Sequence, residues 1–116
     1  MSDVTIYHNP GCGTSRATLA LLRENGVEPT VVEYLKVGWS KPQLEVLLTR
    51  MGKSAHEILR IRGTQAHELG LTDPNASDAA LVAAMILDPS LVERPIVATP
   101  KGAALCRPAE LVLTLL

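Results

Sequence analysis

The sequence predicts an α/β fold, a four-stranded mixed sheet with flanking helices and an inserted helical block. Three observations predict this class. Short β-favouring runs enclose a helical pattern at the start of the chain, the middle is helical, and two further β-favouring runs precede a last helix. With 116 residues, of which 47% are hydrophobic and 20% charged, we expect a single domain over residues 1–116 with its own core.

The first three elements form a predicted β-α-β unit. Alternating apolar and polar side chains predict a strand over residues 3–8, and helical spacing of leucines predicts a helix over 14–24, ended by Asn25-Gly26. Residues 30–35 are rich in β-branched side chains and predict a second strand. Because the crossover is short, the two strands are expected to be parallel, with the helix covering one face.

Four hydroxyl side chains in the middle of the chain have the spacing of helix N-caps. They are Ser40, Ser54, Thr64 and Ser77. The first two are followed three residues later by Gln or Glu, as in a capping box. They predict a helix ending at Gly52 and a short helix to about residue 59. The other two predict a brief turn through residues 69–70 and a helix over residues 79–87.

The end of the chain returns to strands. Residues 95–99 and 103–106, joined by a turn over 100–102, predict an antiparallel hairpin. Pro108 then begins the last predicted helix, since proline is favourable in a first turn.

Cys12 lies at the predicted turn between the first strand and the first helix. A first helical turn presents backbone N–H groups without partners and the positive end of the helix dipole, and both stabilise a thiolate. We therefore expect Cys12 to be acidic and nucleophilic, on a surface loop of small polar residues. Gly11 and Gly13 allow close backbone approach, so the loop is also expected to seat a small oxyanion. The alternative is an inert thiol in the core.

Composition excludes several classes of partner. With 3% aromatic residues there are few rings to stack on bases, and a net charge of −1 gives no long-range attraction to nucleic acid or membranes. Without a basic leader or a long apolar run, we expect a cytoplasmic protein that does not bind membranes. His8, His56 and His67 have no second Cys or His at metal-ligand spacing, so no metal is expected. Cys106 is interpreted as a buried structural thiol rather than a resolving cysteine.

Three arginines lie at predicted element boundaries. Arg60 ends the short helix, Arg94 precedes the third strand and Arg107 precedes the last helix. A guanidinium stays charged and matches tetrahedral oxyanions, so arginines converging on Cys12 would bind such a substrate and lower the thiol pKa. The alternative for each is a solvated surface charge, and periodicity leaves convergence open.

Two polar residues flank the cysteine. His8 is expected to be a cationic or hydrogen-bonding neighbour of the thiol, or else an exposed turn residue. Ser15 is expected to donate its hydroxyl to the thiolate, or else to satisfy only the backbone.

The segment from Tyr7 to Arg16, with its Cys-Gly-Thr-Ser-Arg run, resembles the active-site segment of the glutaredoxin-linked arsenate reductases, a thioredoxin-superfamily group. The later Arg-Pro-Ile-Val run at residues 94–97 and Cys-Arg-Pro run at 106–108 resemble that family in order and spacing. The resemblance covers practically the whole chain. It implies a thioredoxin/glutaredoxin-like fold with an inserted helical block.

The resemblance also implies roles for particular residues. Cys12 matches the family's nucleophile. The expected substrate-binding residues are Arg60, Arg94, Arg107, Gly13, Thr14 and Ser15, with His8 and Pro95 in support. In relatives the proline that opens the third strand follows a cis peptide bond and faces the cysteine, which would fall on Pro95.

By the same resemblance, the Cys12 thiolate attacks arsenate to form a thio-arsenate ester. Glutathione then adds, and glutaredoxin resolves the mixed disulfide as arsenite leaves. No bound cofactor is expected, glutathione being the reductant, and the protein is expected to be a monomer or weak dimer.

Two other functions stay open. One is a glutathione-dependent thiol/disulfide reductase whose arginines hold the carboxylates of glutathione. The other is a non-catalytic redox regulator that binds RNA polymerase. Such regulators use a Cys-x-x-Cys switch, and Ser15 occupies the place of the second cysteine here.

Overall fold

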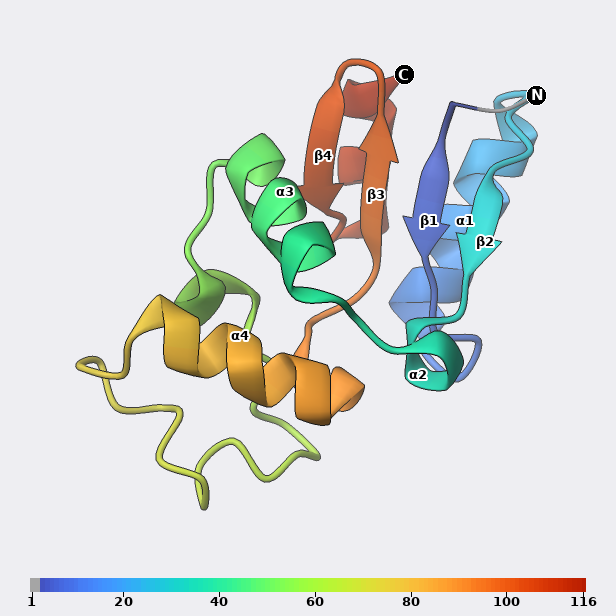
Figure 1. Ribbon diagram of the computed structural model, residues 1–116. Coiled ribbons are helices and arrows are strands. Elements are labelled where there is room, and N and C mark those ends of the chain that lie inside the picture. Colours follow the sequence, from blue (N-terminus) through green and yellow to red (C-terminus); the bar gives the residue numbers. More distant parts are fainter. Residues whose placement is uncertain (1–2) are drawn as a thin grey trace. The chain divides into compact units, whose positions relative to one another are not determined.

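The computed structural model describes residues 3–116 and confirms the predicted fold class. The chain forms two compact units (Figure 1). The first consists of the described residues up to Val37 together with Arg94–Leu116, and it contains all four strands. The second, Gly38–Glu93, contains the inserted helical block.

The sheet has the strand order β2-β1-β3-β4. The strands are β1 (Thr5–Tyr7), β2 (Thr30–Val32), β3 (Ile96–Thr99) and β4 (Gly102–Leu105). β1 and β2 are parallel, whereas β3 is antiparallel to both β1 and β4, so the predicted β-α-β unit and C-terminal hairpin are confirmed. This arrangement puts the chain segments that follow β1, precede β3 and follow β4 at one edge of the sheet.

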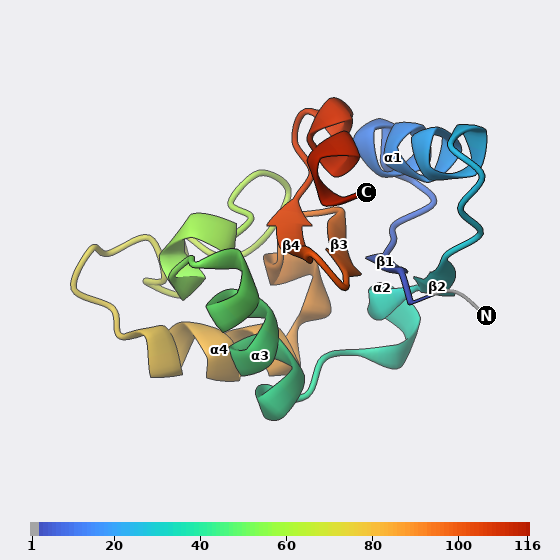
Figure 2. The ribbon, with the colours of Figure 1, turned by 90° about the horizontal axis from the view of Figure 1, so that it is seen from above.

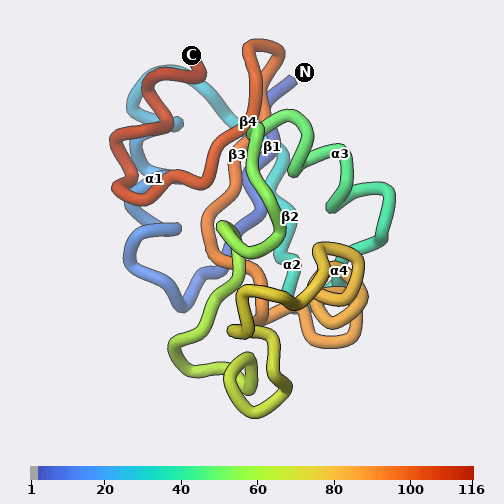
Figure 3. The backbone as a smooth tube through the Cα atoms, turned by 90° about the vertical axis from the view of Figure 1, so that its left-hand side faces the viewer, coloured from blue at the N-terminus to red at the C-terminus, as the bar shows by residue number. Residues whose placement is uncertain are grey.

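The helix α1 (Gly13–Glu24) and the 3-10 segment η3 (Ala109–Leu115) pack against each other on one face of this sheet (Figures 2 and 3). Apolar side chains from both elements and from the strands form the core of the first unit. They are Val4, Ile6, Leu22, Val97, Cys106, Val112 and Leu115. Burying this aliphatic surface holds α1, and hence its N-terminus, against the sheet.

The helical unit begins at the predicted capping box. The Ser40 hydroxyl accepts a hydrogen bond from the Gln43 N–H at 3.3 Å, and the Gln43 side chain accepts from the Ser40 N–H at 3.3 Å. These bonds start α3 (Lys41–Met51), which ends at Gly52 with φ of 65°. A φ in this region strains any residue with a side chain, which is why glycine stands there.

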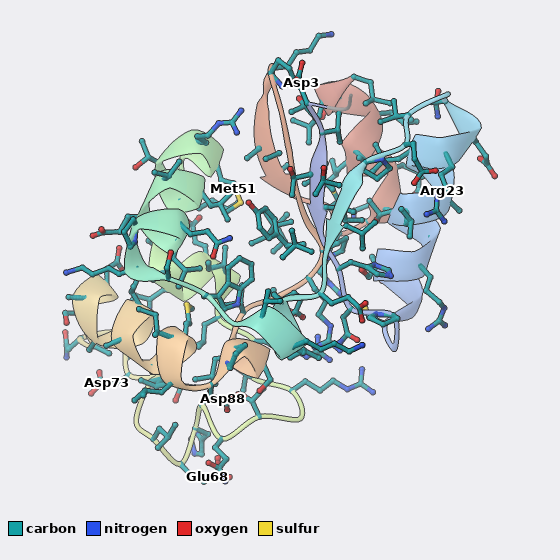
Figure 4. The ribbon with its side chains drawn as sticks, turned by 45° about the vertical axis from the view of Figure 1, so that its right-hand side comes forward. Asp3, Arg23, Met51, Glu68, Asp73 and Asp88 are labelled. Atoms are coloured by element: carbon teal, nitrogen blue, oxygen red, sulfur yellow. The ribbon has the colours of Figure 1, made fainter. Side chains whose placement is uncertain are left out.

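The helix α4 (Asp78–Leu87) contacts α3 and the 3-10 segments η1 (Ala55–Ile58) and η2 (Pro89–Leu91). Ser77 caps α4 as predicted, its hydroxyl accepting from the Ala80 N–H at 3.1 Å. The irregular chain between η1 and α4 carries the labelled Glu68 and Asp73 (Figure 4). The predicted turn after Thr64 appears there as single hydrogen-bonded turns rather than a helix.

The predicted strand over residues 30–35 is too long. β2 ends at Val32, and Tyr34–Val37 forms the short helix α2. The Glu33 carbonyl accepts hydrogen bonds from the N–H groups of Lys36 and Val37, and the Tyr34 side chain is fully buried. Local turn formation and burial of this ring outweigh the β propensity of the segment. Within residues 3–116, none of the helices has the length and apolar character needed to cross a bilayer.

Candidate active site

Cys12 is the N-cap residue of α1, between the end of β1 and the first helical turn. Its carbonyl accepts the first intrahelical hydrogen bond, from the Arg16 N–H at 3.0 Å. By helix geometry, the N–H groups of Gly13, Thr14 and Ser15 precede that bond and point out of the helix end beside the sulfur. The side chain is 9% exposed, so the thiol lies mostly within the protein surface rather than on an open loop.

Two arginines from the sheet approach this sulfur. Register pairs Tyr7 with Ile96 and Ile96 with Leu105, so Arg94, just before β3, and Arg107, just after β4, come to the end of β1. Nη1 of Arg107 lies 3.9 Å from Sγ of Cys12 and donates to the Arg94 carbonyl at 2.9 Å. The sequence left the convergence of these arginines open; in the structure Arg107 approaches the Cys12 sulfur, and both arginines act on the pKa of the thiol.

Proline residues follow both arginines. The Arg94-Pro95 bond is cis, as the resemblance implied, and the Arg107-Pro108 bond is cis as well, which was not predicted. The Pro95 carbonyl accepts from the Cys106 N–H at 2.9 Å, which continues the β3–β4 pairing beyond the strands. The arginine-bearing segments are therefore held side by side.

The thiol of Cys12 is acidic for a cysteine. Burial is the largest single influence and raises its pKa. Hydrogen bonding from Arg94, from the backbone N–H of Ser15 and from Arg107 acts in the opposite direction, and the positive charge of Arg94 adds to it. Together these donors outweigh burial and lower the pKa of Cys12 from 9.0 to about 7. A large share of the thiol is therefore ionised, and nucleophilic, at neutral pH.

His8 and Ser15 form a buried pair beneath the loop. Nδ1 of His8 lies 2.6 Å from the Ser15 hydroxyl oxygen, which also accepts from the Asn9 N–H at 3.1 Å. Burial is the main cause that lowers the pKa of His8 below its ordinary 6.5, which favours the uncharged ring. The alternative of an exposed turn residue is wrong, because His8 is buried and its ring is hydrogen-bonded to Ser15. The Ser15 hydroxyl is bound to His8 and Asn9, and it is the backbone N–H of Ser15, not its hydroxyl, that helps to lower the pKa of Cys12.

The turn that precedes Cys12 is closed by its own hydrogen bonds. The Asn9 carbonyl accepts from the Cys12 N–H at 3.0 Å, and the Asn9 side-chain oxygen accepts from the Gly11 N–H at 2.9 Å. Nη1 of Arg16 donates to the Pro10 carbonyl at 2.8 Å. Sequence reasoning assigned no role to Asn9 or Arg16, although an Asn-Pro-Gly run is itself a turn signal.

Gly13 and Thr14 lie in the first turn of α1, as predicted. Gly13 is exposed and Thr14 is partly exposed, and both directly follow Cys12. The Thr14 carbonyl accepts from the Thr18 hydroxyl at 2.8 Å, a bond that ties the first turn of the helix to the second.

Arg60 belongs to the helical unit. Nη1 of Arg60 is 2.8 Å from a carboxylate oxygen of Glu93, and the two side chains are 15% and 24% exposed. The Arg60 N–H donates to the Leu91 carbonyl at 2.8 Å, so backbone and side chain are held by the same segment. The expectation of a fully solvated Arg60 is wrong within this unit.

Cys106 is fully buried in the core of the first unit, and burial raises its pKa to about 12. The interpretation of Cys106 as a structural thiol is confirmed, since a protonated, inaccessible sulfur is a poor nucleophile. Across residues 3–116, His, Cys, Asp and Glu side chains form no group of three that would hold a metal ion.

The fold places the chain in the class of thioredoxin-like proteins, and the site puts a cysteine at a helix N-terminus beside arginines. The chain belongs to the ArsC family, which it matches over residues 7–115.

Relatives are similar over nearly the whole chain. An arsenate reductase of Rhizobium meliloti (strain 1021) is 52% identical over 97% of this chain and 81% of its own length. One of Escherichia coli (strain K12) is 46% identical over 100% of this chain and 82% of its own. The solved arsenate reductase from Vibrio cholerae superposes with a TM-score of 0.92 at 43% identity, covering 97% of each chain.

Proposed function

We propose that this protein reduces arsenate to arsenite with Cys12 as the nucleophile. The observation that supports this most directly is the distance of 3.9 Å between the Arg107 guanidinium and the Cys12 sulfur, whose pKa is about 7. An ionised thiol beside a guanidinium offers both a nucleophile and a countercharge for a tetrahedral oxyanion. Membership of the ArsC family, with relatives named arsenate reductase, supports arsenate as that oxyanion.

Backbone and side-chain donors would bind the substrate. The N–H groups of Gly13 and Thr14 at the start of α1 suit an oxyanion because helix N-termini favour negative charge. Arg94 and Arg107 would spread the charge of arsenate and of the oxygen that leaves. The resemblance also implies an oxyanion-binding role for Arg60, which remains part of the proposal.

The proposed reaction balances with two thiols. The Cys12 thiolate attacks arsenic(V), a hydroxyl group leaves as water, and a sulfur–arsenic bond forms. The thiolate of glutathione then attacks the Cys12 sulfur. The electron pair of the sulfur–arsenic bond passes to arsenic, which becomes arsenic(III) and leaves as arsenite. Cys12 and glutathione remain as a mixed disulfide, having each lost one electron.

Glutaredoxin would reduce the mixed disulfide and return Cys12 to its thiol. The chemistry needs no bound cofactor, because glutathione supplies the electrons as a diffusible co-substrate. A site that depends on reduced glutathione requires a reducing compartment, and we place the protein in the cytoplasm on that ground.

A coupled assay tests the proposal. NADPH oxidation is followed with glutathione, glutaredoxin and glutathione reductase, with and without arsenate. We expect arsenate-dependent oxidation for the wild type, background for Cys12→Ser and near wild-type activity for Cys106→Ala, the matched control at the buried cysteine. Cys12→Ser activity within about tenfold of wild type would refute the nucleophile assignment.

The same assay separates the alternative activity. Replacing arsenate with a small glutathione mixed disulfide measures thiol/disulfide reduction. If the wild-type protein reduces that disulfide but does not reduce arsenate, the protein is a thiol/disulfide reductase. Omission of glutaredoxin, with all other components kept, tests whether this partner is required.

A further inference from the structure

The turn from Asn9 to Cys12 satisfies its own backbone groups, and Asn9 makes most of the bonds. The Asn9 carbonyl binds the Cys12 N–H, its side-chain oxygen binds the Gly11 N–H, and its own N–H binds the Ser15 hydroxyl. Pro10 has no N–H. Each N–H from Asn9 to Cys12 is therefore used inside the protein, and the N–H groups that remain for a ligand follow Cys12.

The packing of Gly11 shows how closely the Asn9 side chain controls this turn. A Cβ added to Gly11 would lie 3.3 Å from the Asn9 side-chain oxygen, which is tight enough to displace it by a few tenths of an ångström. Glycine is favoured at position 11 by this contact and not by its φ, which is not positive. The hydrogen bond from the Gly11 N–H and the absence of a Cβ at Gly11 thus both favour the observed position of the Asn9 side-chain oxygen.

The outer side of the turn is held by Arg16. Its guanidinium donates to the Pro10 carbonyl across six residues, from the first turn of α1. The turn is thereby tied to α1 at Pro10 as well as through the Asn9–Ser15 bond. Of the residues in this network, Asn9 is the one whose side chain bonds a backbone group within the turn itself.

We propose that Asn9 is a positioning residue for Cys12. By closing the turn it sets the sulfur at the N-terminus of α1 and beside Arg107, and it leaves the N–H groups of Gly13 and Thr14 as the backbone donors for an oxyanion. The inference deepens the proposed function, because it rests on Cys12 as the nucleophile.

The pKa of the Cys12 thiol is a measure of whether the sulfur keeps this position. The groups that act on the sulfur are the guanidinium groups of Arg94 and Arg107 and the N–H of Ser15, and the loop also carries the buried His8 and the exposed Arg16. Arg94, Arg107 and the Ser15 N–H act over hydrogen-bond distances, so a sulfur displaced from them binds its proton more tightly.

The test is the pH dependence of iodoacetamide alkylation of the reduced full chain, resolved by mass spectrometry into Cys12 and Cys106. For Asn9→Ala we expect the apparent pKa of Cys12 to rise by about one unit, which lowers the thiolate fraction at pH 7 from about a half to about a tenth. Alkylation of Cys12 at pH 7 should then slow about fivefold. No substrate is needed, so the result is independent of arsenate reduction.

Two variants serve as controls. Asn9→Ser keeps a short uncharged acceptor for the Gly11 N–H and is expected to restore most of the wild-type profile. Asn25→Ala removes an asparagine that donates to the Leu21 carbonyl at the opposite end of α1, and it should leave the profile unchanged. Cys106, fully buried, remains unreactive as long as the first unit is folded.

An unshifted Cys12 profile in Asn9→Ala, with Cys106 unreactive, would overturn the proposal, as would a shift that Asn9→Ser fails to reverse. If Cys106 reacts in Asn9→Ala because that variant unfolds, Gly11→Ala replaces it, since its Cβ displaces the same oxygen. A wild-type profile in Gly11→Ala would also overturn the proposal. A wild-type protein that fails to reduce arsenate refutes the proposed function, whereas an unshifted variant refutes this inference.

Discussion

Cys12 is acidic because several donors share one sulfur. Burial opposes ionisation, and a single hydrogen bond would not compensate for it. Arg94, Arg107 and the Ser15 N–H together reverse the effect of burial. The Arg94 carbonyl holds the Arg107 side chain in place, because it accepts a hydrogen bond from Nη1, the same nitrogen that lies near the Cys12 sulfur.

Substituting Arg107 should therefore affect both the thiol and the substrate. For Arg107→Ala we expect a higher pKa of Cys12 in a thiolate absorbance titration. We also expect oxyanion binding to weaken by about 1.5 to 3 kcal/mol, the scale of a charge-assisted hydrogen bond, measured through the KM for arsenate.

Two further variants complete that experiment. Arg107→Lys keeps the charge but loses the planar fork, so it should recover part of the pKa shift and less of the binding. Arg60→Ala tests the third arginine through the KM for arsenate. A titration curve of Arg107→Ala that superimposes on the wild-type curve would contradict the role given to this guanidinium.

At the level of single elements, the three longest helices begin at an N-cap residue with a hydroxyl or thiol side chain. α3 and α4 use serine hydroxyls, whereas α1 has Cys12 at its N-cap. In the inserted block the N-cap residues stabilise their helices. In the sheet unit the N-cap residue is Cys12, and the same helix end favours the ionised form of its thiol.

Removing the α3 cap should cost stability without affecting the thiol. For Ser40→Ala we expect the free energy of unfolding to fall by about 1 kcal/mol in urea denaturation, because the Gln43 N–H loses its acceptor. Thr49→Ala, at an exposed hydroxyl in the last turn of α3 that bonds the Glu45 carbonyl, is the matched control and should change the free energy of unfolding by less than about 0.5 kcal/mol. Equal losses in both variants would contradict the capping role.

For the whole molecule, the two cysteines make stability depend on pH in opposite directions. The folded pKa of Cys12 is about 7 against an ordinary 9.0, so between these values the unfolded chain binds more protons. The folded pKa of Cys106 is about 12, so above pH 9 the unfolded chain binds fewer. The contribution of Cys12 to the free energy of unfolding is fully present above about pH 9 and is lost as the pH falls through 7. The contribution of Cys106 destabilises the fold above pH 9.

We therefore expect the free energy of unfolding to rise between pH 7 and pH 9 by about 2 kcal/mol, at 1.36 kcal/mol per unit of pKa shift. Urea denaturation at both values under reducing conditions measures the rise. In Cys12→Ser the rise should disappear, while Cys106→Ala should keep it. A rise of equal size in Cys12→Ser would show that another group carries the pH dependence.

Local sequence patterns were enough to predict the features that depend on residues close together in the chain. The caps of α3 and α4, the stop at Gly52, the start of α1 at Cys12 and the two terminal pairs of strands all follow from patterns within a few residues. The strand predicted over residues 30–35 failed in its second half, where burial of Tyr34 outweighed local propensity.

The groups that surround the Cys12 sulfur are known only from the folded chain. Arg107 is 95 residues from Cys12 in the chain, and the register of β1, β3 and β4 brings it there. Burial, which no local pattern measures, lowers the pKa of His8, and the fold places its ring 2.6 Å from the Ser15 hydroxyl. The ionisation of a thiol depends on distances through space, and those distances are set by strand pairing and core packing rather than by spacing along the chain.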